Sequence, residues 1–437
     1  MSPSSLAGHV IELIDEILKS RLPADRVVAD FYKERRYLGS HDRRWITEKV
    51  YGIIRNYILL REVAGTCAPR KDSVYTFLIY ELLLVKMQTD ELEGGYSKLM
   101  ETYRLAGYEI DLLSLSECAE RRMEEIRISD EGMFTMNSFP EFFAELLPAS
   151  IQPDALPIML ALNHEARVCV RVDTNRISRD DVMADFRRQG IEAAASDLSP
   201  MGIYLPRRVN LNNVALYKDG VIDIQEEASQ IVGLAVDPKE GETIVDACAG
   251  AGGKSLELAA LSGGGARIYA LDVDQNRLNA LAERAGKSGF ENIEVIKVQP
   301  DGLEGAESII GTADKVVVDA PCTGSGTIRR NPDKKFRLTR SLVQTHASYQ
   351  KDIIQRYSKL VKVDGYLYYA TCSIFADENQ SVVEWFIKSN PQFRVIDISL
   401  SLTDPKYAGL IENGFLAIYP HRHEMDGFFA AAMKRQG

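Results

Sequence analysis

Two cysteines in the second half of the chain each follow a short, apolar, β-rich run. Cys322 ends the segment Asp319-Ala320-Pro321-Cys322, and Cys372 stands in Ala370-Thr371-Cys372-Ser373. A lone cysteine is usually a small buried hydrophobe. Two cysteines at neighbouring strand ends can instead supply a nucleophilic thiolate and a second sulfur group to one pocket. We give the buried interpretation to three cysteines nearer the N-terminus, which are Cys67, Cys118 and Cys169.

A thiolate beside a carboxylate suits methylation of cytosine at C5. That carbon is a poor nucleophile, but a thiolate that adds to C6 makes C5 nucleophilic, and a base must later remove the C5 proton. Asp319 could hydrogen-bond the cytosine N3 and exocyclic amine. An enzyme that methylates an exocyclic amine needs no covalent nucleophile and commonly carries a D/N-P-P-Y/F motif, whereas Cys322 stands in the aromatic position here. Spacing alone leaves open which cysteine attacks.

A glycine-rich segment, residues 246–255, follows an earlier predicted strand. Glycines allow a tight turn and a close approach of the backbone to a ligand, beside a helix N-terminus with free N–H groups. The segment is not a phosphate-binding P-loop, because the residue five before Gly253 is a cysteine. The predicted cofactor-binding residues of this segment are Cys248, Ala249, Gly250, Ala251, Gly252, Gly253 and Lys254.

Acidic residues end the successive predicted strands. Asp272 stands about 20 residues past the glycines, where a carboxylate can accept hydrogen bonds from a ribose diol. Asp301 follows the next strand, and Asp319 ends the one after it. With Asp246 they would repel a pyrophosphate, but they suit a ligand with hydroxyls, an adenine amine and a cationic centre. The pattern favours S-adenosylmethionine over NAD, and we add Arg277 to the cofactor-binding candidates.

From about Gly241 the chain alternates β-rich runs with helical patterns, which is typical of a doubly wound α/β fold with a mainly parallel sheet. The predicted strands are Thr243–Asp246, Arg267–Asp272, Ile293–Val298, Lys315–Asp319 and Gly365–Thr371, with Phe415–Tyr419 and Phe428–Met433 closing the sheet. We expect the first five in the spatial order 3-2-1-4-5. The first, fourth and fifth strand ends are then neighbours, so the glycine loop and both cysteines should line one crevice.

The first 145 residues show helical periodicity throughout. Apolar positions recur at helical spacing from Leu6, again after Asp42, which we take as a cap, and again from Val74 to Met87 after Asp72. A break with prolines follows. Val168–Val172 and Ile203–Leu205 then look like strands. We therefore predict three domains: an all-helical domain at residues 1–145, a small α/β subdomain at 146–225 and the catalytic domain at 226–437.

The composition is that of an ordinary globular protein, with 45% hydrophobic and 26% charged residues among 437. No stretch approaches the roughly 18–20 apolar residues of a membrane span, and no signal peptide is apparent. The six cysteines form no CxxC pair. That spacing argues against a zinc site and a disulfide framework, and it favours a reducing cytosol. We expect no metal, including at His421 and His423, no membrane association and a cytoplasmic protein.

The net charge of −11 is unusual for a general nucleic-acid binder. RNA contacts would have to come from local basic runs and from a pocket that captures one base. The first candidate run consists of Lys33, Arg35, Arg36, Arg43 and Arg44. The second consists of Arg329, Arg330, Lys334, Lys335, Arg337 and Arg340. A charge run is more often a solvated helix face.

The two cysteine segments and the glycine loop together resemble the RNA cytosine-C5 methyltransferases of the Fmu/Sun type. In that family the Thr-Cys cysteine is the nucleophile and the Pro-Cys cysteine assists release, so the resemblance implies that Cys372 attacks and Cys322 aids resolution. DNA cytosine-C5 enzymes use the Pro-Cys cysteine instead. Residues 226–230 and 426–429 match the beginning and end of the family's catalytic domain.

The N-terminal half is similar to the same enzymes. Segments 38–44 and 50–55 are similar to the NusB-like RNA-binding domain of the bacterial ribosomal RNA enzymes, and the middle segment would be their RNA-recognition-like subdomain. One departure stands out, because the family usually has Ala-Ala-Pro-Gly-Gly-Lys where this chain has Ala249-Gly250-Ala251-Gly252-Gly253-Lys254. The loss of proline leaves the turn less pre-set.

The resemblance implies a Rossmann-like, S-adenosylmethionine-dependent enzyme that methylates cytosine in small-subunit ribosomal RNA, acting as a monomer. Two alternatives stay open at this point. One is a methyltransferase that acts on transfer RNA, on DNA or on an exocyclic amine. The other is a non-catalytic RNA-binding factor of ribosome assembly, which would need a degenerate cofactor site.

Overall fold

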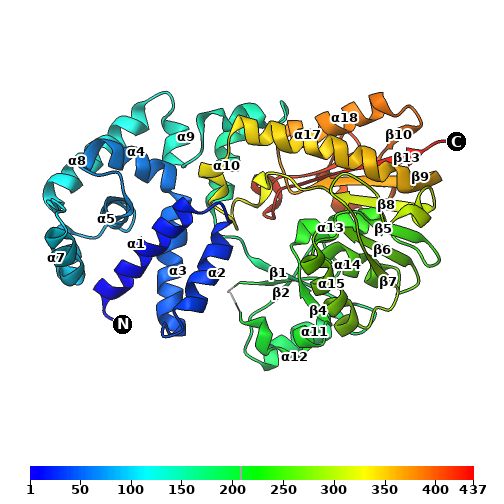
Figure 1. Ribbon diagram of the computed structural model, residues 1–437, viewed down its shortest axis with the longest axis horizontal. Coiled ribbons are helices and arrows are strands. Elements are labelled where there is room, and N and C mark those ends of the chain that lie inside the picture. The colour runs from blue at the N-terminus through cyan, green and yellow to red at the C-terminus, as the bar shows by residue number, and fades with distance from the viewer. Residues whose placement is uncertain (207–208) are drawn as a thin grey trace. The chain divides into compact units, whose positions relative to one another are not determined.

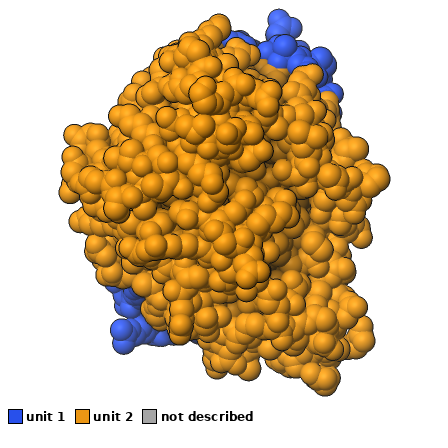
Figure 2. Space-filling view, turned by 90° about the vertical axis from the view of Figure 1, so that its right-hand side faces the viewer, with its two compact units in different colours: residues 1–145, 149–163, 328–338 blue, residues 146–148, 164–327, 339–437 orange. Residues whose placement is uncertain are grey.

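The computed structural model describes residues 1–206 and 209–437 (Figure 1). The chain forms two compact units. Unit 1 comprises residues 1–145, 149–163 and 328–338, and unit 2 comprises residues 146–148, 164–327 and 339–437 (Figure 2). Residues 149–163 and 328–338 therefore belong to the helical unit by their packing. The sequence analysis places the first segment in the small α/β subdomain and the second in the catalytic domain. The division into three domains stays a prediction.

Unit 1 is built from helices around one apolar core. Its periodic positions, such as Val10, Ile14 and Ile17 in the first helix, are buried and pack against Val50 and Ile53. The elements are α1 (Pro3–Lys19), α2 (Ala24–Glu34), α3 (Ser40–Arg55), α4 (Tyr57–Cys67), α5 (Ser73–Leu83), α6 (Thr89–Gly95), α7 (Ser97–Leu105), α8 (Leu112–Ile128), α9 (Gly132–Met136), α10 (Ala155–Asn163) and α16 (Lys334–Arg337).

Two helices begin near aspartates, and only one of these aspartates caps its helix. Asp72 caps α5, because its side chain accepts hydrogen bonds from the backbone N–H groups of Val74 and Tyr75. The prediction that Asp42 caps the third helix is wrong. That helix begins at Ser40, its cap position is Gly39, and Asp42 lies in the first turn. A carboxylate in the first turn is stabilised by the positive end of the helix dipole, but it does not cap the helix.

The segment 328–338 contains the second predicted basic run except Arg340, which is exposed at the start of α17. Lys335 is 1% exposed, and its Nζ donates to the carbonyl of Arg55, to that of Asn137 at 3.2 Å and to Oδ1 of Asn163 at 2.7 Å. Arg337 donates to two backbone carbonyls and pairs with Asp333. These side chains serve packing within the helical unit, so the predicted RNA-binding role is wrong for them.

The first predicted basic run is engaged within α1, α2 and α3. Arg35 pairs with Glu12 at 2.6 Å and Glu16 at 3.4 Å, Lys33 with Asp30, and Arg44 with Glu48. Ion pairs between neighbouring side chains are the more common role of a charge run on helices. Three of the five cations of the run, Lys33, Arg35 and Arg44, are therefore engaged in ion pairs on the helix surface.

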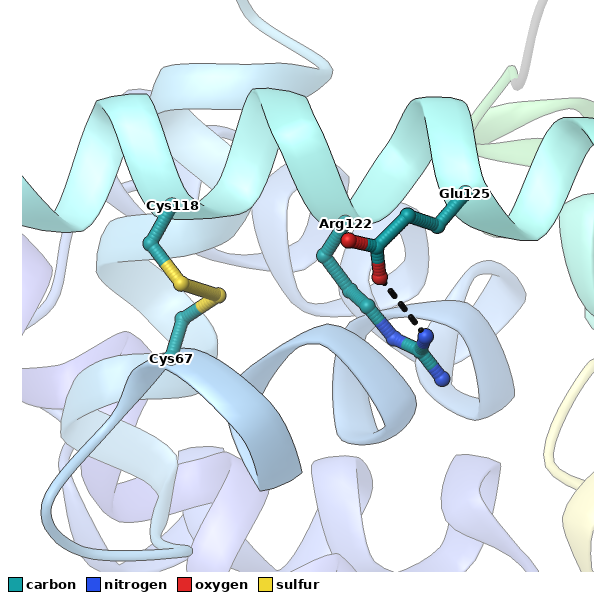
Figure 3. The surroundings of a disulfide bond; sticks show 4 residues. All are labelled: Cys67, Cys118, Arg122 and Glu125. Atoms are coloured by element: carbon teal, nitrogen blue, oxygen red, sulfur yellow. Dashed lines mark hydrogen bonds and ion pairs between the residues drawn. A yellow bond between two sulfur atoms is a disulfide. The ribbon is translucent and has the colours of Figure 1, made fainter.

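A disulfide joins Cys67, the last residue of α4, to Cys118 in α8, with 5.7 Å between the two Cα atoms (Figure 3). The expectation of no disulfide, and of two buried free thiols, is wrong. The two cysteines are 51 residues apart, and only the packing of α4 against α8 brings them together. The pairing removes one argument for a reducing compartment. Cys169 is buried, as predicted, and it takes no part in a disulfide of the described residues.

A four-stranded antiparallel sheet in the order β2-β3-β1-β4 begins unit 2. Both predicted strands belong to it. Its core contains Val170, Val172, Phe186 and Ile203. The elements are β1 (Val168–Val172), α11 (Arg179–Arg188), β2 (Ala194–Ala195), β3 (Gly202–Leu205), α12 (Ala215–Lys218) and β4 (Ile222–Ile224).

The central sheet has the path β11-β12-β13-β9-β8-β5-β6-β7, with β10 paired to β13. The pairs from β9 to β7 are parallel and those of β13 are antiparallel. This confirms the predicted order 3-2-1-4-5 and the closing strands. The elements are β5 (Thr243–Asp246), β6 (Arg267–Asp272), β7 (Ile293–Lys297), β8 (Ala313–Asp319), β9 (Val361–Thr371), β10 (Phe393–Ile396), β11 (Ile411–Glu412), β12 (Phe415–Ile418) and β13 (Phe428–Arg435).

Helices cover both faces of this sheet, because neighbouring residues of a strand point to opposite sides. Val316 and Val318 face a core that includes residues of α17 and α18, while Val317 faces a core that includes residues of α13 and α14. The parallel sheet is thus buried on both faces. These elements are α13 (Glu227–Val236), α14 (Gly253–Leu261), α15 (Gln275–Ser288), α17 (Arg340–Tyr357) and α18 (Gln380–Ser389).

Lys335→Met should lower the free energy of unfolding by about 2–4 kcal/mol, because three acceptors lose a buried donor. Burial, with a smaller effect of Arg55, lowers the pKa of Lys335. The unfolded chain then holds a proton that the folded chain lacks, so this group makes the wild type more stable as the pH rises toward about 10. The difference from the variant should therefore widen with pH in urea unfolding.

Lys98→Met is the matched control, since Lys98 is an exposed lysine of α7. It should change the free energy of unfolding by less than about 0.5 kcal/mol. Equal stability of the two variants at every pH would contradict the structural role given to Lys335.

Candidate active site

Parallel pairing of β8 with β9 brings the two cysteine segments together. Asp319 lies opposite Ala370 in the register, and Ala320 N–H donates to the Ala370 carbonyl at 2.8 Å. Beyond this pair the chains continue to Cys322 and Cys372, whose Sγ atoms lie 3.4 Å apart. Both side chains are half-buried. The predicted convergence of the two sulfur atoms is therefore present in the fold.

Further hydrogen bonds hold the two cysteine loops to each other. Gly326 N–H donates to the Cys372 carbonyl at 3.0 Å, and Ile374 N–H donates to Ser325 Oγ at 2.9 Å. Gly326 also packs against Gly427, where an added Cβ would lie 2.1 Å from the Gly427 carbonyl oxygen. This close approach of three chain segments requires glycine at 326.

Glu378 is the central link between the loops. It is fully buried just past β9 and accepts hydrogen bonds from Thr323 N–H at 2.8 Å and Thr323 Oγ1 at 2.5 Å. It also accepts from Ser373 Oγ at 2.5 Å and from Gln350 Nε2 at 3.1 Å. Thr323 and Ser373 directly follow the two cysteines, so one carboxylate positions both thiol-bearing segments.

The predicted catalytic acid is held by a buried lysine. Lys254 Nζ lies 2.9 Å from Asp319 Oδ2 and donates to Ser229 Oγ at 2.7 Å. Burial alone would lower the pKa of Lys254, but Asp319 and other nearby carboxylates raise it above its ordinary value. The lysine is therefore charged, and it pairs with the half-buried Asp319, whose remaining lone pairs can still accept hydrogen bonds.

The glycine loop turns sharply between β5 and α14. Gly250 and Gly252 have φ angles of 55° and 91°, in the left-handed region. A Cβ on Gly252 would also lie 2.5 Å from Leu281 Cγ. Gly250 N–H donates to Asp272 Oδ2 at 2.9 Å. The loop thus presents the first turn of α14, whose N–H groups have no acceptor within the helix.

The carboxylates around this loop create an environment suited to a cationic ligand. Asp246 is fully buried, and burial together with Asp319 and Asp272 raises its pKa to about 6 although Ser255 and Lys254 lower it. Its Oδ1 is buried without a hydrogen-bond partner among the described residues. A sulfonium or ammonium group would relieve this repulsion. The residues therefore fit S-adenosylmethionine.

Of the other predicted cofactor-binding residues, Asp272 is buried beside the glycine loop, whereas Asp301 and Arg277 are exposed. Asp272 is 8% exposed, and each of its oxygens accepts one backbone N–H, from Gly250 and from Asp274, so lone pairs remain for a ribose diol. Asp301 is exposed in the turn after β7. Arg277 is exposed at the start of α15, where it lies 3.7 Å from Asp274. Neither Asp301 nor Arg277 forms part of the buried cluster.

Cys248 lies in the glycine loop, with a pKa raised well above the ordinary value by burial and by Asp246, Asp319 and Asp272. It is consequently a neutral thiol.

Among the described residues, no helix is long and apolar enough to cross a membrane, and no group of three or more metal-ligating side chains occurs. His423 accepts from Tyr419 N–H through Nδ1, and its Nε2 lies 3.1 Å from the Gly409 carbonyl, which fits packing.

Several residues of the site escaped sequence reasoning. Glu378 and Asn379 stand in Ala-Asp-Glu-Asn, which looks like an ordinary polar turn. Ser229 and Arg284 lie in helices 25 and 30 residues from Lys254. Only the position of Glu378, six residues after Cys372 in the segment that follows the same strand, could have pointed to a role near the cysteines.

Two family models match this chain. The model described as 16S rRNA methyltransferase RsmB/F matches residues 233–434, which contain the glycine loop and both cysteine loops. The model for the ferredoxin-like domain of RsmF/B-like methyltransferases matches residues 139–212. The chain belongs to the RsmB/F family of 16S rRNA methyltransferases.

Similar proteins agree with this membership in the RsmB/F family. The probable ribosomal RNA small subunit methyltransferase B of Bacillus subtilis is 26% identical over 452 residues, covering 100% of both chains. The crystal structure of PH0851 shares the fold with a TM-score of 0.78, at 24% identity over 100% of this chain and 99% of that one.

A second solved structure shares the fold. NSun6 from Pyrococcus horikoshii, crystallised with the S-adenosylmethionine analogue SFG, has a TM-score of 0.61 at 20% identity, covering 69% of this chain and 100% of its own. This RsmB/F member is an S-adenosylmethionine-dependent ribosomal RNA methyltransferase, and its substrate is RNA. The non-catalytic alternative is therefore not favoured.

Glu378→Gln should lower kcat for methyl transfer about 10- to 100-fold while the Kd for S-adenosylmethionine changes less than about threefold. The four groups around Glu378 donate hydrogen bonds, so an amide NH₂ at this position would face donors and loosen both cysteine loops. Steady-state transfer of a tritiated methyl group at saturating RNA and calorimetric titration with the cofactor measure the two effects.

Glu384→Gln is the matched control, since Glu384 is an exposed glutamate of α18. Its kcat should equal that of the wild type. An unchanged kcat in folded Glu378→Gln protein would show that the two loops do not need this carboxylate.

Proposed function

We propose that this RsmB/F enzyme methylates the C5 carbon of a cytosine in small-subunit ribosomal RNA through a covalent enzyme–RNA adduct. The observation that carries the proposal is the 3.4 Å separation of the Cys322 and Cys372 sulfur atoms. Transfer to an exocyclic amine has no use for two thiols, whereas C5 chemistry needs one group to attack the ring and one to help release it.

In the proposed reaction, the Cys372 thiolate forms a bond to C6 of the cytosine. The ring electrons move toward C5, which becomes a carbon nucleophile. After C5 carries the new methyl group, its proton passes to a base, the C6–sulfur bond breaks, and the electron pair returns to the thiolate. Cys322, whose sulfur lies beside Cys372, is the group that assists this release.

Asp319 is the group that binds the base. As a carboxylate paired with Lys254, it can accept hydrogen bonds from the exocyclic amine of cytosine and from a protonated N3. Protonation at N3 would make the ring more electrophilic at C6. Asp319 is 32% exposed, so it is reachable by a base that has left its stack and entered the pocket.

The cofactor would be held by the glycine loop, residues 248–254, and by Asp272 and Asp319, with Asp246 supplying negative charge. The bound S-adenosylmethionine supplies an electrophilic methyl group. The chain contributes the loop N–H groups, the carboxylates that bind hydroxyl and amine groups, and a low-polarity setting in which the cationic centre is attracted strongly. Asp301 and Arg277 would act at the exposed rim.

The N-terminal parts of the chain would dock the RNA. We assign this role to the helical domain at residues 1–145 and the small α/β subdomain at 146–225, and the chemistry to 226–437. Because the chain is acidic overall, recognition would depend on RNA shape and on the extruded base more than on many phosphate contacts.

Cys322→Ala should accumulate a covalent complex with undermodified ribosomal RNA, because the adduct forms on Cys372 and is not released. Cys372→Ala should form none, and both variants should lose turnover by more than about 100-fold. Denaturing gel electrophoresis with labelled RNA detects the adduct. An adduct in the Cys372 variant, with none in the Cys322 variant, would reverse the two roles.

The site and chemistry of methylation are tested by nucleoside mass spectrometry of the product RNA, combined with bisulfite mapping in a strain that lacks the protein. We expect 5-methylcytidine in small-subunit ribosomal RNA. N4-methylcytidine would rule out the covalent mechanism, and methylation of transfer RNA alone would rule out the proposed substrate.

A further inference from the structure

The cofactor loop of this chain contains two left-handed glycines and no proline, yet a side chain from another helix holds it. Arg284 of α15 donates through Nη1 to the carbonyl of Ala251, between Gly250 and Gly252. Ala251 is exposed and Arg284 is 31% exposed. The bond fixes the peptide plane between Ala251 and Gly252, which leads directly into α14.

The guanidinium of Arg284 is itself anchored at its other nitrogen. Nη2 pairs with Asp223 Oδ2 on β4 of the small antiparallel sheet. Asp223 lies opposite Arg171 in the register of β1 and β4, and Arg171 Nη2 lies 3.9 Å from the same Asp223 oxygen. Arg284 is thus held between a strand and the loop, and its planar fork suits two acceptors at once.

The small antiparallel sheet that contains Asp223, with the loops next to its strands, is held to α14 and α15 by further hydrogen bonds. Gln225 donates to buried Glu257 of α14 at 2.6 Å, and Asn175 donates to the Ala260 carbonyl at 2.5 Å. Arg176 donates to the Ser288 carbonyl of α15 at 3.4 Å. Asp223 therefore has a set position relative to both α14 and α15, and it can orient Arg284 reliably.

We propose that Arg284 is a positioning residue for the cofactor. It pre-sets the glycine loop in place of the proline that Fmu/Sun-type enzymes usually have at the position of Ala251. A loop that is already ordered loses less conformational entropy on binding and so binds its ligand more tightly. The inference rests on the proposed assignment of this loop to S-adenosylmethionine.

Arg284→Ala should weaken the binding of S-adenosylmethionine to the full-length protein about tenfold in Kd, the size expected for loss of one charge-assisted hydrogen bond. Isothermal titration measures the Kd. Hydrogen exchange of the amides of residues 249–253 without cofactor should be faster than in the wild type. Lys287→Ala, an exposed lysine of the same helix that pairs only with Glu283 among the described residues, should change neither quantity.

The decisive variant restores the family proline and keeps Gly250, whose φ of 55° requires glycine. Ala251→Pro should return the Kd of Arg284→Ala protein to within about threefold of the wild type, because proline pre-sets the backbone instead. No hydrogen bond of the described residues uses the Ala251 N–H that proline would remove. In the wild-type background the same loop change should alter the Kd less than about threefold. Failure of rescue, with the loop variant binding normally on its own, would overturn the proposal.

A folding defect is detected separately. If Arg284→Ala does not fold, Asp223→Asn leaves Arg284 in place but weakens its anchor, and it should raise the Kd about threefold. Wild-type affinity and exchange in either folded variant would overturn the proposal. Asp272→Ala separates the role of Arg284 from the assignment of the loop to the cofactor. If Asp272→Ala and Arg284→Ala proteins both bind S-adenosylmethionine normally, the loop is not the cofactor site. If Asp272→Ala protein loses binding while Arg284→Ala protein binds normally, only the role of Arg284 is rejected.

Discussion

Parallel pairing of β8 with β9 is the constraint on which the candidate chemistry depends. Both strands end at the same edge of the sheet, so the segments that follow them leave it side by side. The pairing by itself sets only the strand ends, at Asp319 and Ala370. Two or three residues farther on the chains could diverge, and the buried carboxylate of Glu378 prevents this by binding both segments. Register and one internal acid together determine where the sulfur atoms lie.

The charges around the glycine loop differ from those beside the cysteine loops. Burial, together with the carboxylates around the glycine loop, raises the pKa of Asp246 and that of the Cys248 thiol. Lys254 forms its ion pair with Asp319, on the strand end next to the cysteine loops. The acidic part around the glycine loop therefore suits a sulfonium ligand. The strand end beside the cysteines carries an acid whose charge is matched by a buried lysine.

The sequence allowed the strands, their order and the convergence of the cysteines to be predicted, because a buried parallel strand is an apolar run and its end is marked by a polar residue. Contacts that depend on three-dimensional partners could not be predicted. Cys67 and Cys118 meet only because α4 packs on α8. Glu378 looks like a turn residue until Thr323 and Ser373 are seen to donate to it. Lys335 looks like a surface charge until three acceptors surround it.

The fate of the basic runs bears on how an acidic chain recognises RNA. Arg35 pairs with Glu12 of α1, Lys33 pairs with Asp30 of its own helix, and Lys335 and Arg337 bind backbone carbonyls inside the helical unit. Cations used in this way release few counterions when RNA binds, so they contribute little general affinity. These contacts support the proposal that recognition depends on the shape of the RNA and on the fit of one extruded base, which phosphate contacts do not read. Under the proposed covalent mechanism, two thiols and an acid can act only on a base that reaches them. Access to the base, more than attraction to the RNA backbone, would then select the substrate.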